Sequence, residues 1–308
     1  MFAYMVQRIA QGFVVLFLVT LLTFGIMQAA PGDPIDLMVG EAQITQAEFD
    51  RIRERWGFDR PWYEQYVTWL SNFVRGDLGR SVVRTGVPVH EMVLEAAWPT
   101  IQLNVLAMIL ATSIAIPAGV LAAVKRYSIF DSGTMIWASA GVALPNFWVG
   151  LMLIILFALT LGWLPSFGAG TWKHLVMPVA VLAINETALL TRLMRGTTLE
   201  VMNQDFVTTA RSKGLRENAV LIRHIIRNAM LPSVTVIGLR VAFLLSGTIV
   251  VETIFGYPGI GQLFITSVYR LDYQVIQAVV VLFTLFVVVA NIVTDMVYAI
   301  IDPRIRVQ

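Results

Sequence analysis

Six long apolar stretches run through this sequence, and they restrict the folds that the chain can adopt. A helix needs about 20 mostly apolar residues to cross the hydrocarbon core of a bilayer. Inside that core only helices and closed barrels satisfy the backbone hydrogen bonds, and these stretches lack the alternation of barrel strands. The stretches are Ile9–Ala29, Thr100–Val124, Met135–Leu161, Leu175–Leu193, Leu231–Thr253 and Val275–Ile301. We therefore predict an all-α membrane protein with six transmembrane helices.

The composition agrees with a membrane protein and excludes several other classes. Charged residues make up 14% of the 308 residues, against about 25% in soluble domains. Because the sequence has no cysteine, disulfides, cysteine-based metal sites and thiol chemistry are excluded. The histidines, His90, His174 and His224, fit no metal-ligand spacing, so we expect no metal site. A net charge of +2 is too small to indicate a nucleic-acid partner.

Basic residues in the short connections predict the orientation of the chain, because such residues concentrate on the cytoplasmic side of a membrane. If the N-terminus is cytoplasmic, the short loops on the opposite side contain only Lys173 and Arg270. The basic residues that then face the cytoplasm are Arg8, Lys125, Arg126, the seven from Arg192 to Arg227, Arg304 and Arg306. We therefore predict that both ends of the chain are cytoplasmic (N-in, C-in).

These spans divide the sequence into three parts. Residues 1–30 hold the N-terminus and first span, residues 31–98 form an extracytoplasmic region, and residues 99–308 form a core with five spans and a cytoplasmic loop at 194–230. In the extracytoplasmic region, Thr45 and Glu48 form a capping-box pattern that predicts a helix start. An apolar stripe follows, made of Tyr63, Tyr66, Val67 and Leu70. The stripe fits either packing on the spans or contact with the membrane interface or an outside partner.

A cationic segment separates the fourth and fifth apolar stretches. Asp205 is placed to cap the N-terminus of a short helix, and Gly214 is placed to end it at the C′ position. Arg211 and Lys213 near that end complement the helix dipole. Leu215–Met230 then predicts a second amphipathic helix that leads into the fifth span. The segment is either a positive-inside anchor or a docking element, and its caps and length favour docking.

Several motifs, in order, resemble those of ABC importer permeases, in the branch that serves dipeptides, oligopeptides, nickel and glutathione. "DFVTTARSKGL" at 205–215, followed by "RHIIRNAMLP" at 223–232, resembles the cytoplasmic EAA loop of these proteins. "TTA" at 208–210 stands where the general motif has Glu-Ala-Ala, as looks usual for the peptide branch. The other matching motifs are "APGDP" at 30–34, "WGFDRP" at 56–61, "GDLGRS" at 76–81, "VVETIFGYPGIGQL" at 250–263 and "DPRIR" at 302–306. The resemblance covers nearly the whole chain.

The resemblance implies partners and site residues. It implies a heterodimer of two permeases in the inner membrane of a prokaryote, two ATP-binding subunits inside and a solute-binding protein outside. The cationic segment would be a coupling helix in a cleft of an ATPase subunit, with Ala210 facing that cleft. The implied coupling residues are Asp205, Thr209, Ala210, Arg211, Lys213, Gly214 and Leu215. The exit of the fifth span would form an outer gate, made of Glu252, Tyr257, Pro258 and Gly259.

Neither an ATPase site nor a cofactor site is expected in this chain. The sequence has no G-x-x-x-x-G-K-[ST] phosphate loop, so ATP and Mg would bind the partner ATPase subunits. The resemblance leaves the substrate open among peptides, nickel, glutathione and oligosaccharides. Because no run of acidic or histidine residues in the spans predicts a metal path, short peptides are favoured.

Polar residues inside the predicted spans form a second set of candidates, because such residues are costly in lipid and usually face a bundle interior or a cavity. They are Asn104, Asn146, Asn185, Glu186, Arg240, Asn291 and Asp295. The similar depths of Arg240, Asp295 and Glu186 predict an ion pair that either ties spans together or contacts substrate, and a tie is favoured. Prolines inside the spans predict kinks or breaks. These are Pro117, Pro145 and Pro178.

Two other function classes fit the residues less well. An intramembrane metalloprotease needs a motif such as H-E-x-x-H, and no histidine lies in a predicted span. A serine-type intramembrane enzyme needs a Ser/His or Ser/Lys pair within the spans, and none is evident. A secondary transporter would favour inverted repeats, and the sequence shows no clear internal symmetry.

Overall fold

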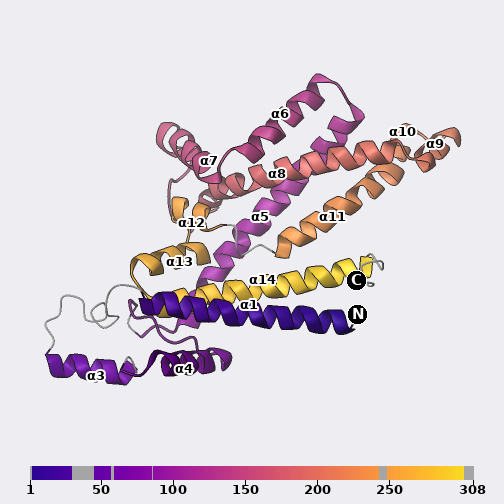
Figure 1. Ribbon diagram of the computed structural model, residues 1–308. Coiled ribbons are helices and arrows are strands. Elements are labelled where there is room, and N and C mark those ends of the chain that lie inside the picture. The colour runs from indigo at the N-terminus through magenta and orange to yellow at the C-terminus, as the bar shows by residue number, and fades with distance from the viewer. Residues whose placement is uncertain (1, 30–44, 57–58, 85, 243–247, 302–308) are drawn as a thin grey trace. The chain divides into compact units, whose positions relative to one another are not determined.

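The fold is helical throughout the part of the chain that a computed structural model describes, namely residues 2–29, 45–56, 59–84, 86–242 and 248–301. Within these residues the one extended pairing is an isolated bridge between Arg80 and Pro88. The chain divides into two compact units, one of residues 1–99 with 259–308 and one of residues 100–258. The prediction of an all-α membrane fold is confirmed (Figure 1).

Five helical segments of the described chain are long and apolar enough to cross a membrane. They are Val6–Ala29 in α1 (Phe2–Ala29), α5 (Val89–Val124), α8 (Lys173–Met202), Glu217–Gly238, and Tyr273–Val293 in α14 (Tyr273–Ile301). Two bent helix pairs raise this number to as many as seven if each pair is one span. The structure therefore agrees with a multi-span protein, while the predicted total of six spans and their orientation stay predictions.

The third predicted span is broken. α6 (Ile129–Ala143) and α7 (Asn146–Leu153), which continues into the π-helix η1 (Ile154–Thr160), meet at 103°. Leu144 between them is extended, with ψ of 127°, because proline disfavours helical backbone in the residue before it. The predicted span Met135–Leu161 is thus two helices, and the predicted break at Pro145 is confirmed.

The other two prolines do not break their helices. α5 runs from Val89 to Val124 as one element that contains Pro117, and α8 runs from Lys173 to Met202 as one element that contains Pro178. Neighbouring helices and local adjustments can satisfy the carbonyl that a proline frees in a membrane helix. Proline position alone therefore did not distinguish a break from a continuous helix.

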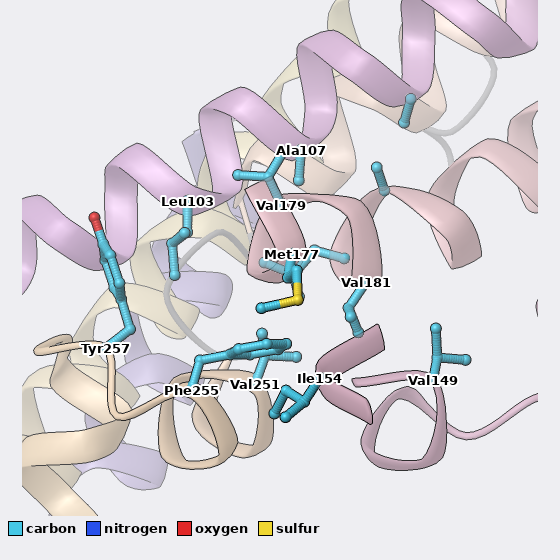
Figure 2. Close-up of a cluster of buried hydrophobic side chains, with 13 residues drawn as sticks. Leu103, Ala107, Val149, Ile154, Met177, Val179, Val181, Val251, Phe255 and Tyr257 are labelled. Carbon is cyan, nitrogen blue, oxygen red and sulfur yellow. The ribbon is translucent and has the colours of Figure 1, made fainter. Parts of the chain in front are cut away.

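The core of the 100–258 unit joins four parts of the chain. α12 (Ile249–Phe255) contributes Val251 and Phe255, which pack against side chains of α5, α7–η1 and α8. Figure 2 shows these side chains converging from their separate helices. α5 and α8 also approach closely, since a Cβ atom on Gly119 would lie 2.8 Å from the carbonyl oxygen of Thr191. Small residues allow such backbone contact between membrane helices.

The other unit is built on α1 and α14, which lie side by side (Figure 1). Their close approach needs Gly12, where an added Cβ would lie 2.7 Å from Cγ1 of Val288. α13 (Ile260–Tyr269) also packs on α14. The turn between these two helices is tied to the segment before α5, because the buried hydroxyl of Ser81 donates to the carboxylate of Asp272.

Two helices of the predicted extracytoplasmic region belong to this unit, α3 (Gln46–Trp56) and α4 (Trp62–Val74). The predicted capping box at α3 is confirmed: the backbone nitrogen of Thr45 donates to Glu48 at 2.9 Å, and the nitrogen of Glu48 donates to the Thr45 hydroxyl at 3.4 Å. These bonds from Thr45 hold the pKa of Glu48 below its ordinary value. The "APGDP" and "DPRIR" motifs lie outside the described residues, as does part of "WGFDRP".

The predicted apolar stripe of α4 only partly packs inward. Tyr66 is buried, and its hydroxyl forms a 2.9 Å hydrogen bond with the hydroxyl of Thr20 in α1. Tyr63 and Val67 of the same predicted stripe instead point away from the protein. The interpretation that the stripe packs on the spans is therefore right for Tyr66. It is wrong for Tyr63 and Val67.

Candidate functional site

The cationic segment folds into a short helix at the end of α8. α8 ends at Met202, and α9 (Asp205–Ser212) begins after Gln204, whose backbone is extended. Asp205 is thus the first helical residue and not the N-cap, and no side chain caps this end. The predicted capping role of Asp205 is wrong, although its charge in the first turn still complements the helix dipole.

The end of α9 matches the prediction. Lys213 is the C-cap, and Gly214 follows with φ of +77°. The backbone nitrogen of Gly214 donates to the carbonyl of Arg211 at 2.9 Å, and that of Lys213 donates to Thr209 at 3.1 Å. No atom lies within 4 Å of a Cβ built on Gly214. Glycine is therefore required here by the left-handed backbone and not by lack of space.

Ala210 faces the protein and not outward. Together with Val207, one turn earlier on the same side of α9, it packs against Val220 and Ile225 of the following helix. The prediction that Ala210 points toward a partner is wrong in direction. The small side chain at this position instead lets α9 lie close to the chain's own next helix.

α9 and the turn after it expose two large apolar side chains within a polar segment. Phe206 and Leu215 are each 43% exposed, and Thr209 and Lys213 are exposed beside them. Leu215 was among the predicted contact residues, whereas Phe206 was missed. A phenylalanine in this otherwise polar segment was a signal that the sequence already contained.

The turn after α9 is braced by an ion pair. Nη2 and Nε of Arg211 donate to the two carboxylate oxygens of Glu217, at 2.7 and 3.2 Å. The hydrogen bonds that Arg211 donates to Glu217 raise the pKa of Arg211 above its ordinary value. Because both side chains are exposed, this paired contact sets the direction of the turn more than it adds to stability.

The segment after the turn joins the next span directly. α10 (Glu217–Ala219), the π-helix η2 (Val220–Ile226) and α11 (Arg227–Ala242) follow one another without a break. The helix predicted over Leu215–Met230 is therefore present from Glu217 onward and leads into the next span as predicted, although it is itself the beginning of that span. The hydroxyl of Thr197 in α8 donates to the carbonyl of Ala229 at 3.0 Å, so α8 and this segment are also joined across their interface.

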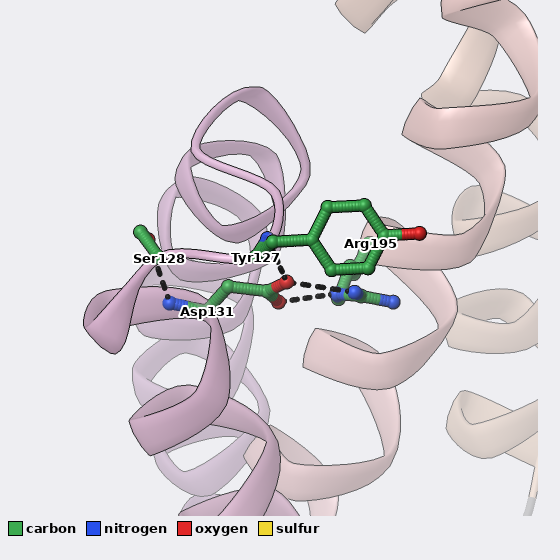
Figure 3. A network of polar contacts seen from close by, with 4 residues as sticks. All are labelled: Tyr127, Ser128, Asp131 and Arg195. Carbon is green, nitrogen blue, oxygen red and sulfur yellow. Dashed lines mark hydrogen bonds and ion pairs between the residues drawn. The ribbon is translucent and has the colours of Figure 1, made fainter.

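A polar network holds α8 just before it reaches α9 (Figure 3). Nη2 of Arg195 donates to Oδ2 of the buried Asp131 at 2.8 Å. The same carboxylate accepts the backbone nitrogen of Tyr127 at 3.0 Å, while the nitrogen of Asp131 donates to the hydroxyl of Ser128 at 3.2 Å. This network joins the turn between α5 and α6 to α8. The Ser-x-x-Asp capping pattern before α6 is the one signal that could have pointed to it.

The predicted outer-gate residues lie around the end of α12. Glu252 is fully buried, and its Oε1 accepts the hydroxyls of Thr100 at 2.7 Å and Thr248 at 2.6 Å. Tyr257 is also buried, and its hydroxyl donates to the side chain of Gln102 at 3.3 Å. These two residues therefore tie α12 and the turn after it to α5 at Thr100 and Gln102, about three turns from the start of that helix.

The two remaining gate residues complete the turn that follows α12. Pro258 follows Tyr257, and Gly259 is the residue that precedes α13. Gly256, which ends α12, adopts φ of +56°. The structure thus places the predicted gate residues at one turn, but it gives Glu252 and Tyr257 an interior position.

The predicted polar residues of the spans lie on different helices of the two units. Asn104 and Asn185 donate to backbone carbonyls, of Thr100 at 2.9 Å and of Gly141 at 3.5 Å. Asn291 lines a groove between α1 and α14 that also contains Arg8. Asn146 and Glu186 are half-buried, and Glu186, which belongs to the predicted ion pair with Arg240 and Asp295, is on α8. The side chains of Arg240 and Asp295 lie outside the described part, so that pair stays a prediction.

Sequence comparison agrees with this arrangement. The pattern of the family described as binding-protein-dependent transport system inner membrane component matches residues 115–307. The pattern of the N-terminal region of such membrane components matches residues 1–102. The chain belongs to this permease family. The resemblance to ABC importer permeases that its motifs indicated is therefore confirmed.

Individual relatives match the permease over its whole length. The oligopeptide transport system permease protein AppB of Bacillus subtilis is 44% identical, over 99% of this chain and 100% of that protein. The glutathione transport system permease protein GsiC of Escherichia coli is 39% identical, over 99% of each chain. A putative peptide permease protein of Brucella suis is 38% identical, over the full length of both.

Solved structures share the fold of the permease at low sequence identity. Inward-facing structures of the MetNI methionine ABC transporter match with a TM-score of 0.55 at 17% identity, over 69% of this chain and 97% of that one. An amino acid ABC transporter matches with a TM-score of 0.51 at 16% identity, over 67% and 92%. These matches show that the permease has the fold of ABC transporter membrane subunits.

Proposed function

We propose that this permease forms half of the translocation pathway of an ATP-driven importer of short peptides, and that α9 passes the motion of an ATPase subunit to the spans. The observation that carries the proposal is the way α9 is mounted. Its inner side, Val207 and Ala210, packs on η2. η2 continues into α11, and α9 itself follows α8 after a short turn. Figure 1 shows α9 and α10 connecting the neighbouring ends of α8 and α11.

This mounting suits force transmission. A helix that is packed on one side and joined to two spans by short turns moves with them, because packed interfaces do not deform freely. The exposed surface of α9 and of the turn after it is available for a partner, with Phe206 and Leu215 as apolar contacts among polar ones. Exposed aromatic side chains of this kind are typical of interface centres. The ATP and Mg that drive the cycle would then be bound by two partner subunits, and this chain would bind neither.

The proposed substrate follows from the relatives. Their names assign oligopeptides, glutathione and peptides to permeases that are 38–44% identical to this one along the whole chain. We infer a short peptide delivered by a solute-binding protein outside a prokaryotic inner membrane, through a pathway shared with a second permease. Glutathione is itself a short peptide, and nickel or an oligosaccharide is the alternative cargo for the same machinery.

Reconstitution of the complete complex tests the proposal. Proteoliposomes with both permeases, both ATPase subunits and the peptide-loaded binding protein should accumulate labelled peptide only with ATP on the ATPase side. Phe206→Ala should uncouple uptake from ATP hydrolysis, whereas Thr208→Ala, an exposed residue on another side of α9, should leave it near normal. Peptide uptake that needs neither ATP nor the binding protein would contradict an ATP-driven importer. Equal uptake by the two variants would contradict the role of α9.

A further inference from the structure

α6 packs along α8 and is fastened to it near both of its ends. Near its start, the buried Asp131 carboxylate accepts Nη2 of Arg195 at 2.8 Å (Figure 3). Near its end, the carbonyl of Gly141 accepts the side-chain nitrogen of Asn185 at 3.5 Å. The two contacts are ten residues apart on each helix, or about 15 Å at the rise of an α-helix. Because the spacing is the same on both helices, α6 must follow a displacement of α8.

Gly141 sets how closely these two helices lie. A Cβ atom added to Gly141 would lie 2.9 Å from Cβ of Ala188 and 3.4 Å from the carbonyl oxygen of Ile184. The first distance is too short for a real Cβ atom, so a larger residue here must move α6 away from α8. Small residues allow such close contact between membrane helices. Gly133, in the same helix, is exposed and has nothing within 4 Å of an added Cβ.

The bend at Pro145 directs α7 onto α12. α6 meets the helix after the bend at 103°, and α7 also packs on α8, so the angle between the two helices is braced. A Cβ atom on Gly150 of α7 would lie 3.4 Å from Cε2 of Phe255 and 3.6 Å from Cγ2 of Ile254. Ile154, which follows α7, is buried in the same cluster as Phe255 (Figure 2). α7 is therefore in direct contact with α12.

α12 ends at the turn that holds the predicted gate residues. Gly256 ends the helix, and residues 257–259 follow it. The carbonyl of Phe255 also accepts the backbone nitrogen of Gly168 at 2.9 Å, so the loop before α8 is bonded to the same end of α12. A displacement of α12 must therefore move this turn and the loop that is bonded to it.

We propose that α6 and α7 form a strut that carries the displacement of α8 and α9 to α12, and that Gly141 is the residue that positions the strut on α8. The proposal rests on the proposed function, in which an ATPase subunit moves α9. The contacts form a continuous route from α9 to the turn after α12, all within the unit of residues 100–258. α8 also reaches the cluster around Phe255 directly, through Met177 and Val181. The strut adds a second contact, so that α12 is moved by two helices that are joined to each other.

A comparison of Gly141→Ala with Gly133→Ala tests the strut. Both changes replace glycine by alanine in α6 and raise helix propensity alike, but only the first brings a Cβ atom against α8. In proteoliposomes with all partners, Gly141→Ala should transport about fivefold less peptide per ATP hydrolysed, the lower end of usual coupling between sites. Gly133→Ala should keep the ratio of the unmodified complex. Gly150→Leu, which places bulk against Phe255, should resemble Gly141→Ala and replaces it if that variant assembles poorly.

Fluorescent labels at two positions locate the loss of coupling. The chain has no cysteine, so Thr208→Cys on α9 and Val250→Cys on α12, both exposed positions, each accept one bimane label in a complex whose other cysteines are replaced. A nonhydrolysable ATP analogue should shift the emission of either label in the otherwise unmodified complex. In the Gly141→Ala background, the analogue should still shift the label on α9 but no longer the label on α12.

Three results would overturn the strut. A normal shift of the Val250→Cys label in the Gly141→Ala background would mean that α8 moves α12 without α6. Equal loss of coupling in Gly133→Ala would assign the effect to a stiffer α6 and not to its contact with α8. ATP-dependent peptide uptake without any response of the Val250→Cys label would show that α12 does not move. Uptake that needs no ATP would instead contradict the proposed function, and the strut with it.

Discussion

Arg195 and Asp131 join the last turns of α8 to the turn before α6, through a guanidinium that donates from both Nε and Nη2 to one carboxylate. The carboxylate is buried, and the Arg195 side chain is 23% exposed. α8 continues from this point for two turns and then passes into α9. The pair therefore fixes the helix that leads into the proposed coupling element.

Arg195→Ala should destabilise the permease, because it leaves the buried Asp131 carboxylate without its main partner. Removing one partner of a buried ion pair costs about 3–5 kcal/mol, and partial exposure of Arg195 places the cost near 3 kcal/mol. The expected result is a lower melting temperature and a lower yield of assembled complex. Arg195→Lys should recover little of the stability that Arg195→Ala loses, because an ammonium cannot form the bidentate hydrogen bonds of a guanidinium.

The matched control for that variant is Arg192→Ala, which removes an exposed arginine from the same helix. It should leave both yield and melting temperature close to those of the unmodified complex. The double variant Arg195→Ala/Asp131→Ala should be more stable than Arg195→Ala alone. If the three variants have the same melting temperature, the ion pair of Arg195 and Asp131 has no structural role.

Ala210→Trp should separate α9 from η2. Ala210 is buried against Val220 and Ile225, and inserting bulk into a packed cluster costs about 1–3 kcal/mol. The change should reduce peptide-stimulated ATP hydrolysis and peptide uptake, while membrane insertion stays normal. Thr208→Trp places the same ring on an exposed position of α9 and should be milder. Full coupled transport by Ala210→Trp would show that the α9–η2 contact transmits nothing.

The first, second, fourth and sixth membrane helices could be located because their length and apolarity follow directly from the thickness of the bilayer. The fifth was predicted over Leu231–Thr253, whereas the helix of membrane length runs from Glu217 to Gly238. The bend at Pro145 was also predictable from one residue, since proline acts on the backbone beside it. The π-helix η2 was not, because the sequence from Leu215 to Met230 has the periodicity of an ordinary helix. A π-helix differs from an α-helix by one residue in the spacing of its backbone hydrogen bonds, and this difference does not show in the amino-acid composition.

The polar contacts were harder to predict than the helices, because their partners are far apart in the sequence. Arg195 and Asp131 are 64 residues apart, and Arg195 was counted only as a charge that sets orientation. The direction of Ala210 was missed for another reason: the segment was interpreted from its charges and caps, although its two buried residues share one side of the helix. Val207, one turn earlier, was the available sign that this side faces inward.

Reporter fusions test the predicted N-in, C-in topology. A fusion after Arg126 or Arg216 should report the cytoplasm, and a fusion at Ser71 or Arg270 should report the outside, because short basic loops stay inside. The measurement is the ratio of alkaline phosphatase to fluorescent-protein signal at each site. An outside signal at Arg216 would contradict both the orientation and the proposed contact of α9 with an ATPase subunit.

The turn after α9 gives the most selective test of coupling, because the backbone and not the side chain decides the outcome. Gly214 has φ of +77°, with open space around the position of a Cβ. Gly214→Val must therefore strain the backbone, by about 1–3 kcal/mol, or redirect the chain toward Leu215 and Glu217. Gly214→Asn adds a side chain of similar size, but asparagine adopts this conformation more readily.

We expect Gly214→Val to insert normally, to lose peptide uptake and to show little stimulation of ATP hydrolysis by the loaded binding protein. Gly214→Asn should retain most of both activities, and Arg216→Ala, exposed just beyond the turn, should be mild. Uptake and ATPase activity in proteoliposomes with all partners provide the comparison. If valine and asparagine impair transport equally, side-chain bulk at the partner surface, and not the left-handed backbone, explains the requirement for glycine. If neither impairs it, α9 acts only as a cationic anchor.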